Sequence, residues 1–227
     1  MTHDPIDQSP SGREDAQVPS LPTPAISASL FPVPCNLFPL RVNDLKQFEY
    51  CPRIVFYNTV MPVERKSTVK MERGKEIELK LDALEARRTL RRYKLSEGER
   101  RYHVWLTSDR LGLTGRLDLL IVTADGCYPV DFKHTRDRPR RNHVLQVAGY
   151  ALLVEDVMHQ PVPAAFIYIA PRNQLVRIAV TEGLRELVRM RLSQIRQMIR
   201  EQFLPEPTPV RARCEECEFR NYCGDVF

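Results

Sequence analysis

Two apolar segments joined by a short turn constrain the fold of this chain most strongly. The stretch GRLDLLIVTADGCYPVDFKHT runs from Gly115 to Thr135 and has the composition of two β-strands. Asp118 interrupts the first segment, and Asp131 and Lys133 interrupt the second. Because a buried charge is costly unless it is paired or bound to a ligand, these residues indicate either a salt-bridged strand pair or a functional site.

The register of this hairpin determines how the three charges meet. Asp131 and Lys133 are two residues apart on one strand, so their side chains share a face. With a four-residue turn at 123–126, Asp118 lies opposite Asp131, whereas with a two-residue turn at 125–126 it lies opposite Lys133. Either register predicts two carboxylates and an ammonium group on one face of the sheet.

This set of groups is suited to the cleavage of phosphodiesters. Two facing carboxylates repel each other unless a cation lies between them, and hard oxygen ligands favour Mg²⁺ or Mn²⁺. Such a metal polarises a phosphodiester and activates water. A neighbouring lysine holds or deprotonates that water, or offsets the negative charge that develops in the transition state.

The helix expected after the hairpin adds groups that suit a nucleic acid. In the sequence QVAGY, Gln146 and Tyr150 are four residues apart and therefore share a helix face. The basic stretch HTRDRPRRNH precedes them, although the helix macrodipole disfavours cations at that end. A bound phosphate would offset this cost, and the alternative is a solvated basic loop. The arginines concerned are Arg136, Arg138, Arg140 and Arg141.

Composition and charge are compatible with this reading. The 227 residues carry 34 Lys and Arg against 29 Asp and Glu, a formal net charge of +5, which fits a polyanionic partner. No apolar run reaches the ~20 residues of a membrane helix, and the N-terminus resembles no signal peptide. We therefore expect a cytoplasmic protein, in which cysteines bind metals more often than they form disulfides.

Three of the six cysteines form a compact cluster near the C-terminus. Cys214, Cys217 and Cys223 lie within ten residues, and Cys51 in YCPR is the best candidate for a fourth ligand. Cys35 and Cys127 are expected to be ordinary thiols. The spacing does not separate Zn²⁺ from an iron–sulfur cluster, and from the residues alone we favour zinc.

The remaining elements follow from periodicity and from turn residues. Residues 1–37 are rich in Pro, Ser and Asp and are predicted to be a disordered tail, followed by one domain over 38–227. Asn43 is a candidate helix cap, and Pro52 is expected to break or restart that first helix. Further helices are predicted over about 67–93, 143–157 and 182–203, and strands over 102–108, 113–122, 128–134, 164–170 and 175–180.

Taken in order, the motifs FEYCPR, G-x-x-D, D-x-K, Q-x-x-x-Y and C-x2-C-x5-C resemble the CRISPR-associated RecB-like exonuclease family, Cas-four. The similarity covers about residues 40–225. It implies an α/β fold with a RecB-type, restriction-endonuclease-like PD-(D/E)xK core, a helical N-terminal part and a C-terminal four-cysteine region. It also implies metal-dependent cleavage of DNA ends, the trimming and selection of motif-adjacent prespacers, and work with the Cas-one and Cas-two integration complex.

The resemblance also implies roles for individual residues. Asp118 and Asp131 match the metal-binding acids, Lys133 matches the catalytic lysine, and Gln146 and Tyr150 match an element that helps to hold DNA. A [4Fe-4S] cluster, rather than zinc, would be bound by Cys51, Cys214, Cys217 and Cys223.

The chain departs from the family pattern at one ligand position. Where the family has a histidine four residues after a helical glycine, here Gly74, this chain has Glu78, which would bind Mg²⁺ or Mn²⁺ in its place. His103 is an alternative ligand. Some family members are fused to the Cas-one integrase, and the sequence leaves open whether this chain is. A non-catalytic DNA-binding adaptor and a zinc-stabilised interaction module are the alternative functions.

Overall fold

The computed structural model describes residues 38–63, 89–135, 137–215 and 217–224. The predicted tail over 1–37, Glu78 and Arg136 lie outside these ranges, as does most of the helix predicted over 67–93. At the described end of that helix, Leu90–Tyr93 forms a 3-10 helix, and Lys94 follows in the left-handed conformation. No helix within the described ranges has both the length and the apolar character needed to cross a bilayer.

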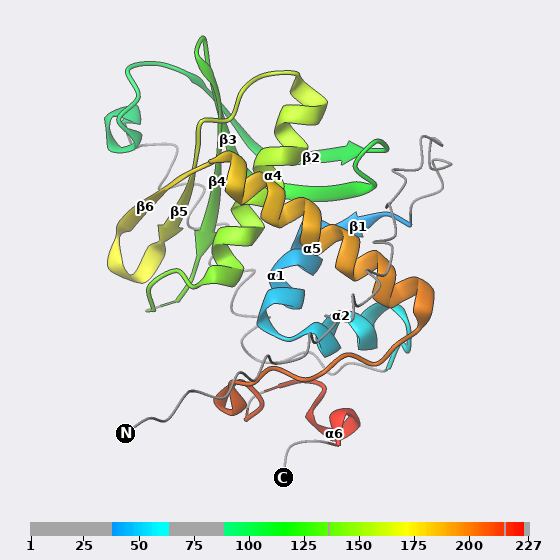
Figure 1. The fold of residues 1–227 in the computed structure, drawn as a ribbon. Coiled ribbons are helices and arrows are strands. Elements are labelled where there is room, and N and C mark those ends of the chain that lie inside the picture. Colours follow the sequence, from blue (N-terminus) through cyan, green and yellow to red (C-terminus); the bar gives the residue numbers. More distant parts are fainter. Residues whose placement is uncertain (1–37, 64–88, 136, 216, 225–227) are drawn as a thin grey trace, which may run out of the picture. The chain divides into compact units, whose positions relative to one another are not determined.

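Two short helices begin the described part of the chain (Figure 1). A two-residue strand β1, Leu40–Arg41, leads into α1, Val42–Tyr50, and then α2, Pro52–Thr59. Pro52 restarts the helix as predicted, because proline is tolerated at the first helical position. The prediction that Asn43 caps this helix is wrong, because the helix begins at Val42. The Asp44 carboxylate instead accepts a hydrogen bond from the Arg41 amide at 2.8 Å.

The strands form one mixed sheet in the order β1-β3-β4-β5-β6, with β2 paired to the other edge of β3. The β1/β3 and β4/β5 pairs are parallel, and the remaining pairs are antiparallel. All the predicted strands are present, with small changes at their ends. Their bounds are β2 Glu99–Ser108, β3 Leu113–Thr123, β4 Gly126–Lys133, β5 Ala164–Ile169 and β6 Gln174–Ala179.

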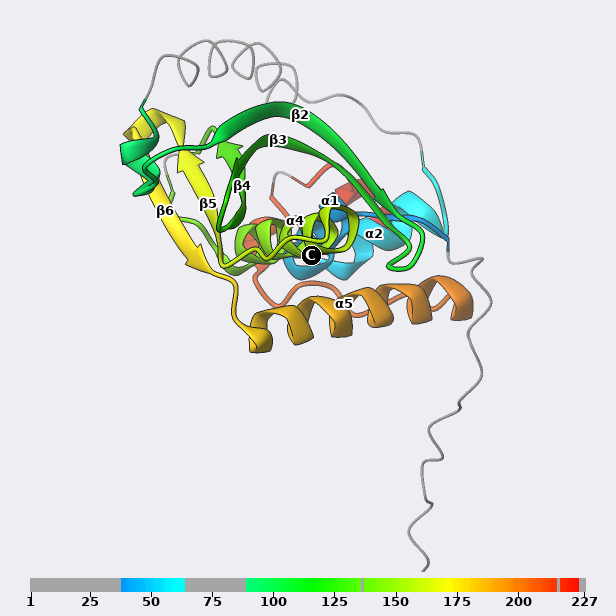
Figure 2. The same cartoon turned by 90° about the horizontal axis from the view of Figure 1, so that it is seen from above.

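The long helix α4, Arg141–Met158, connects the parallel strands β4 and β5 and packs against the sheet and α1. Helix α5, Glu182–Glu201, packs against α4 on the side away from the sheet (Figure 2). The helix predicted over 182–203 is confirmed, and Val188, Leu192 and Ile195 on one of its faces are buried. The short helices are Ala170–Arg172, Arg211–Arg213 and α6, Arg220–Cys223.

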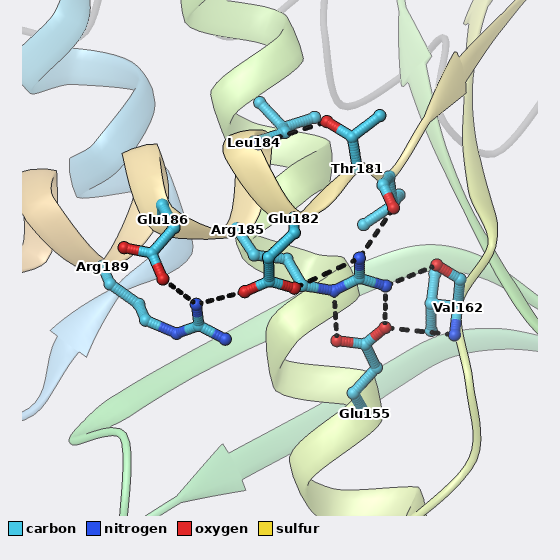
Figure 3. A network of polar contacts seen from close by, with 9 residues as sticks. Glu155, Val162, Thr181, Glu182, Leu184, Arg185, Glu186 and Arg189 are labelled. Atoms are coloured by element: carbon cyan, nitrogen blue, oxygen red, sulfur yellow. Dashed lines mark hydrogen bonds and ion pairs between the residues drawn. The ribbon is translucent and has the colours of Figure 1, made fainter.

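An arginine anchors the start of α5 to α4 (Figure 3). The Arg185 guanidinium donates to both carboxylate oxygens of Glu155, at 3.0 and 2.6 Å, and to the Val180 carbonyl at 2.8 Å. Two parallel bonds from a rigid fork fix the relative orientation of the two helices better than a single contact would.

The buried side chains form two clusters, and β3 contributes residues to both. Leu113 and Leu117 pack in the larger cluster with α1 and α4, and Leu120 belongs to the same cluster. Leu119 and Ile121 instead pack in the smaller cluster with Tyr93. Since the side chains of a regular strand alternate strictly, this pattern requires an irregularity near residue 118.

Candidate active site

Strand β3 has a gap along one edge, next to the predicted acids. β2 follows one edge of β3 along most of its length. The other edge pairs with β1 at Leu113 and Thr114 and with β4 from Leu119 onwards. Over residues 115–118 the described strands provide no ladder partner on that edge, and side chains take their place there.

Two side chains bond within or beside this gap. The Tyr150 hydroxyl, from α4, donates to the Arg116 carbonyl at 2.6 Å. The Asp118 carboxylate accepts a hydrogen bond from the backbone amide of Phe132 at 2.7 Å. On this edge, β3 is therefore bonded by a phenol and a carboxylate instead of a regular ladder, while β2 remains paired to the other edge.

The hairpin register agrees with the four-residue turn. Val122 pairs with Cys127, which aligns Asp118 with Asp131, although the ladder itself stops at Leu119. On the other edge of β3, the register with β2 aligns His103 with Asp118. His103 has a φ of 52°. A left-handed residue inside a strand disturbs pairing, so the row that contains Asp118 is irregular on both sides.

Asp131 and Lys133 form the centre of the candidate site. Asp131 is 3% exposed, and Lys133 Nζ lies 2.6 Å from its Oδ2. At this distance the contact is a charge-assisted pair between an ammonium and a carboxylate.

A second lysine, which the sequence analysis missed, approaches the same acids from α1. Burial, together with the nearby charge of Lys133, lowers the pKa of Lys46 to about 8. The carboxylates of Asp131 and Asp118 act in the opposite direction. These influences place the Lys46 ammonium within the field of the acid pair, although nothing in its local sequence marks this lysine as different from a surface one.

Helix α4 directs three polar side chains of one face towards the acids. His143, Gln146 and Tyr150 follow helical spacing, which is the signal that would have revealed His143 in the sequence. Burial, followed by the charges of Lys133 and Lys46, lowers the pKa of His143 to about 4. Burial together with the carboxylates of Asp131 and Asp118 raises the pKa of Tyr150 above its ordinary value.

The donor set fits a hard divalent cation. Gln146 Oε1 is a buried oxygen without a hydrogen bond, which is unusual in a folded protein, and Asp131 Oδ2 contacts the Lys133 ammonium. With Asp118 they supply the oxygen ligands that Mg²⁺ and Mn²⁺ prefer. Within the described ranges no three His, Cys, Asp or Glu residues are grouped to hold a metal ion, and Glu78 lies outside those ranges.

The arginines at the start of α4 are engaged in ion pairs. The helix begins at Arg141, two residues before the predicted start, and Arg140 directly before it pairs with Asp137 at 3.0 Å. Arg141 pairs with Glu49 at 2.9 Å, and Glu49 also binds Arg191 at 3.0 Å. Because these carboxylates already offset the positive charge at the helix start, phosphate binding by the arginines stays a prediction.

The four predicted ligand cysteines line one small cavity of about 20 Å³ between α2 and the C-terminal segment. Burial raises the pKa of Cys217, and the neighbouring thiols of Cys51, Cys214 and Cys223 act in the same direction. Cys127 lies elsewhere and donates to Gln160 Oε1 at 3.0 Å.

Residues of α2 tie the C-terminal segment in place. Arg53 Nη1 lies 3.2 Å from both the carbonyl oxygen and the Sγ atom of Cys223. The Tyr57 hydroxyl donates to the Tyr222 carbonyl at 3.1 Å. The convergence of Cys51 with the three C-terminal cysteines is thus supported by neighbouring contacts from the same helix.

Comparison with known proteins agrees with this geometry. A family model described as the PD-(D/E)XK nuclease superfamily matches residues 58–224. The CRISPR-associated exonuclease Cas4 of Francisella tularensis subsp. novicida is 28% identical over 84% of this chain and 96% of its own length. The Cas4 exonuclease of Thermoproteus tenax is 28% identical over 80% of this chain and 92% of its own. A Cas4/endonuclease Cas1 fusion of Rhodospirillum rubrum is 30% identical over 52% of this chain and 21% of its own length.

Proposed function

Because the chain belongs to the PD-(D/E)XK nuclease superfamily and is homologous to Cas4 exonucleases, we propose that it trims the ends of prespacer DNA during CRISPR spacer acquisition. The family makes it a nuclease that hydrolyses phosphodiester bonds with a divalent metal. The observation that supports the assignment of the site best is the buried Asp131, whose Oδ2 atom lies 2.6 Å from Lys133 Nζ.

Asp118, Asp131 and the Gln146 amide oxygen would hold the divalent metal, with Glu78 as the further ligand. Such a metal polarises the phosphodiester and lowers the pKa of a water nucleophile. The backbone amide of Phe132 donates a hydrogen bond to the Asp118 carboxylate at 2.7 Å, which holds Asp118 in its orientation.

Two lysines, Lys133 and Lys46, supply positive charge at the site. The Lys133 ammonium, held by Asp131, offsets negative charge on the phosphorus centre in the transition state. Lys46 adds a second positive charge near the acids, which also suits a polyanionic phosphate. Gln146 and Tyr150, the residues predicted to hold DNA, are both buried, and Tyr150 also fixes β3 through the Arg116 carbonyl.

We further propose a [4Fe-4S] cluster at Cys51, Cys214, Cys217 and Cys223. The four thiols line one cavity, so a single centre can be shared by all of them. Four cysteines suit either Zn²⁺ or an iron–sulfur cluster. The resemblance to the Cas-four family favours the cluster over zinc.

Cas1 and Cas2 are the proposed protein partners. A related nuclease exists as a fusion with endonuclease Cas1, which brings the two activities into one polypeptide. We propose that this chain supplies trimmed, motif-adjacent DNA to such an integration complex. A non-catalytic DNA-binding adaptor remains the alternative function, and the intact set of Asp118, Asp131 and Lys133 favours the enzyme.

Cleavage of a DNA duplex with single-stranded, motif-bearing overhangs tests this proposal in the presence of Mn²⁺. We expect the wild type to shorten the overhangs, and to stop at the motif when Cas1 and Cas2 are present. Asp131→Asn should abolish cleavage, whereas Asp125→Asn, in the exposed turn of the same hairpin, should retain it. An Asp131→Asn variant that cleaves like the wild type would contradict the assigned site, and a wild type that binds but never cleaves would favour the adaptor.

A further inference from the structure

A groove of about 550 Å³ lies beside the gap in β3 and contains the one tryptophan of the sequence. Trp105 lines the groove and is 72% exposed, although exposing so large an aromatic surface is unfavourable for folding. A volume of this size suits a small ligand or a single nucleotide.

The charge of the groove suits a polyanion. Among the described residues that line it, Arg41 and Arg116 are cationic, and none is a carboxylate. Trp105 and Arg116 are cross-strand partners, so an aromatic face and a guanidinium are presented side by side. Arg116 is oriented by His103, whose Nδ1 lies 2.7 Å from the Arg116 guanidinium.

The groove is continuous with the candidate active site. Tyr150 lines it and also lies within the field of Asp118 and Asp131. Arg116 and Asp118 are two residues apart on β3, which corresponds to about 6.6 Å along a strand. A nucleotide in the groove would therefore lie within about two nucleotides of the cleaved bond, at ~3.4 Å of rise per nucleotide.

We propose that this groove holds one unpaired nucleotide of the DNA strand being cleaved, with its base stacked on Trp105 and its phosphate near Arg41 and Arg116. This inference rests on the proposed nuclease function and assigns a substrate-positioning residue to it. Stacking on an aromatic side chain tolerates any base, because every base has a π-face. Trp105 thus selects for an unpaired strand end and not for a sequence.

Since Trp105 is the only tryptophan, intrinsic tryptophan fluorescence reports on this groove alone. We would titrate full-length Asp131→Asn protein, which leaves DNA intact, with a duplex that carries an oligothymidine overhang. We expect saturable quenching, and we expect it to disappear when one particular overhang nucleotide is made abasic while the phosphates are kept. Unchanged fluorescence at saturating DNA, or equal quenching by a blunt duplex, would overturn the proposal.

Substitutions provide the second measurement. In the Asp131→Asn background, Trp105→Ala should weaken overhang binding about tenfold, equivalent to about 1.4 kcal/mol, whereas Trp105→Phe should stay within about threefold of the parent. Phe203→Ala, at another aromatic residue that is 61% exposed, is the matched control and should bind like the parent. Equal binding by Trp105→Ala and the parent would overturn the proposal.

The quenching experiment separates this inference from the proposed function. Quenching without cleavage by the wild type would contradict the nuclease function and leave the groove as a nucleotide site. Cleavage without quenching would support the nuclease and overturn the role of Trp105.

Discussion

The hydroxyl of Tyr150 donates a hydrogen bond to the backbone carbonyl of Arg116 at 2.6 Å. Arg116 lies where one edge of β3 has no strand partner, between the residues that pair with β1 and those that pair with β4. A side chain of α4 thereby completes the bonding of the sheet directly beside the acid pair. The contact explains why a buried tyrosine is present next to two carboxylates that raise its pKa.

We predict that Tyr150→Phe lowers the free energy of unfolding by about 1–2 kcal/mol, because the Arg116 carbonyl loses a partner. Cleavage of an overhang should also slow, because the edge of β3 that carries Asp118 is no longer fixed. Tyr168→Phe is the matched control, since it too loses a hydroxyl bond, to Asn173 at 3.1 Å, but lies in the other core cluster. Equal cleavage by the two variants would argue against the positioning role of Tyr150.

Gly115→Ala tests how closely α4 approaches the gap. A Cβ atom at residue 115 would lie 2.8 Å from Tyr150 Cε1 and 3.0 Å from Val42 Cγ2. Because the Tyr150 ring is held by its hydrogen bond, we expect a loss of about 1–3 kcal/mol in stability and a lower cleavage rate. Gly183→Ala, where a Cβ meets nothing within 4 Å, should leave cleavage unchanged. Denaturant unfolding and overhang cleavage measure both effects.

His143 should make the metal-free protein sensitive to mild acid. Its pKa is lowered from 6.5 to about 4 in the fold, so between these values the unfolded chain binds a proton that the folded protein does not. The stability contributed by His143 is therefore present above pH 6.5 and falls as the pH decreases towards 4. His143→Gln removes this contribution, so urea unfolding should show the wild type losing stability relative to the variant across that window. Parallel pH profiles would show that His143 is not held neutral.

Cys51→Ser should remove the proposed cluster. The wild type, purified without oxygen, is expected to be brown with about four irons per chain. Since Cys51 and Cys214 are about 160 residues apart, loss of the shared centre releases a long loop, and we expect Tm to fall by about 10 °C. Cys127→Ser should keep the colour, because Cys127 lies outside the four-cysteine cavity. Colourless wild-type protein with one bound Zn²⁺ would refute the iron–sulfur assignment, and a brown Cys51→Ser variant would refute the site.

The sequence by itself determined the local elements of the fold. Strand alternation and the turn residues were sufficient for the β3–β4 hairpin, but they left two registers open, and the structure selects the one that aligns Asp118 with Asp131. Helical spacing likewise identified α4 and α5. These features are governed by interactions between residues close in sequence, which is why periodicity and turn chemistry reveal them.

Only the tertiary structure decided which distant groups share the site. Lys46 lies more than 70 residues before Asp118, and its local sequence does not distinguish it from a surface lysine. The gap in β3 exists because β1 and β4 pair with different parts of one edge, and the ion pair between Arg141 and Glu49 likewise joins α4 to α1. Such contacts depend on how helices pack against the sheet, and packing joins residues whose separation carries no periodic signal.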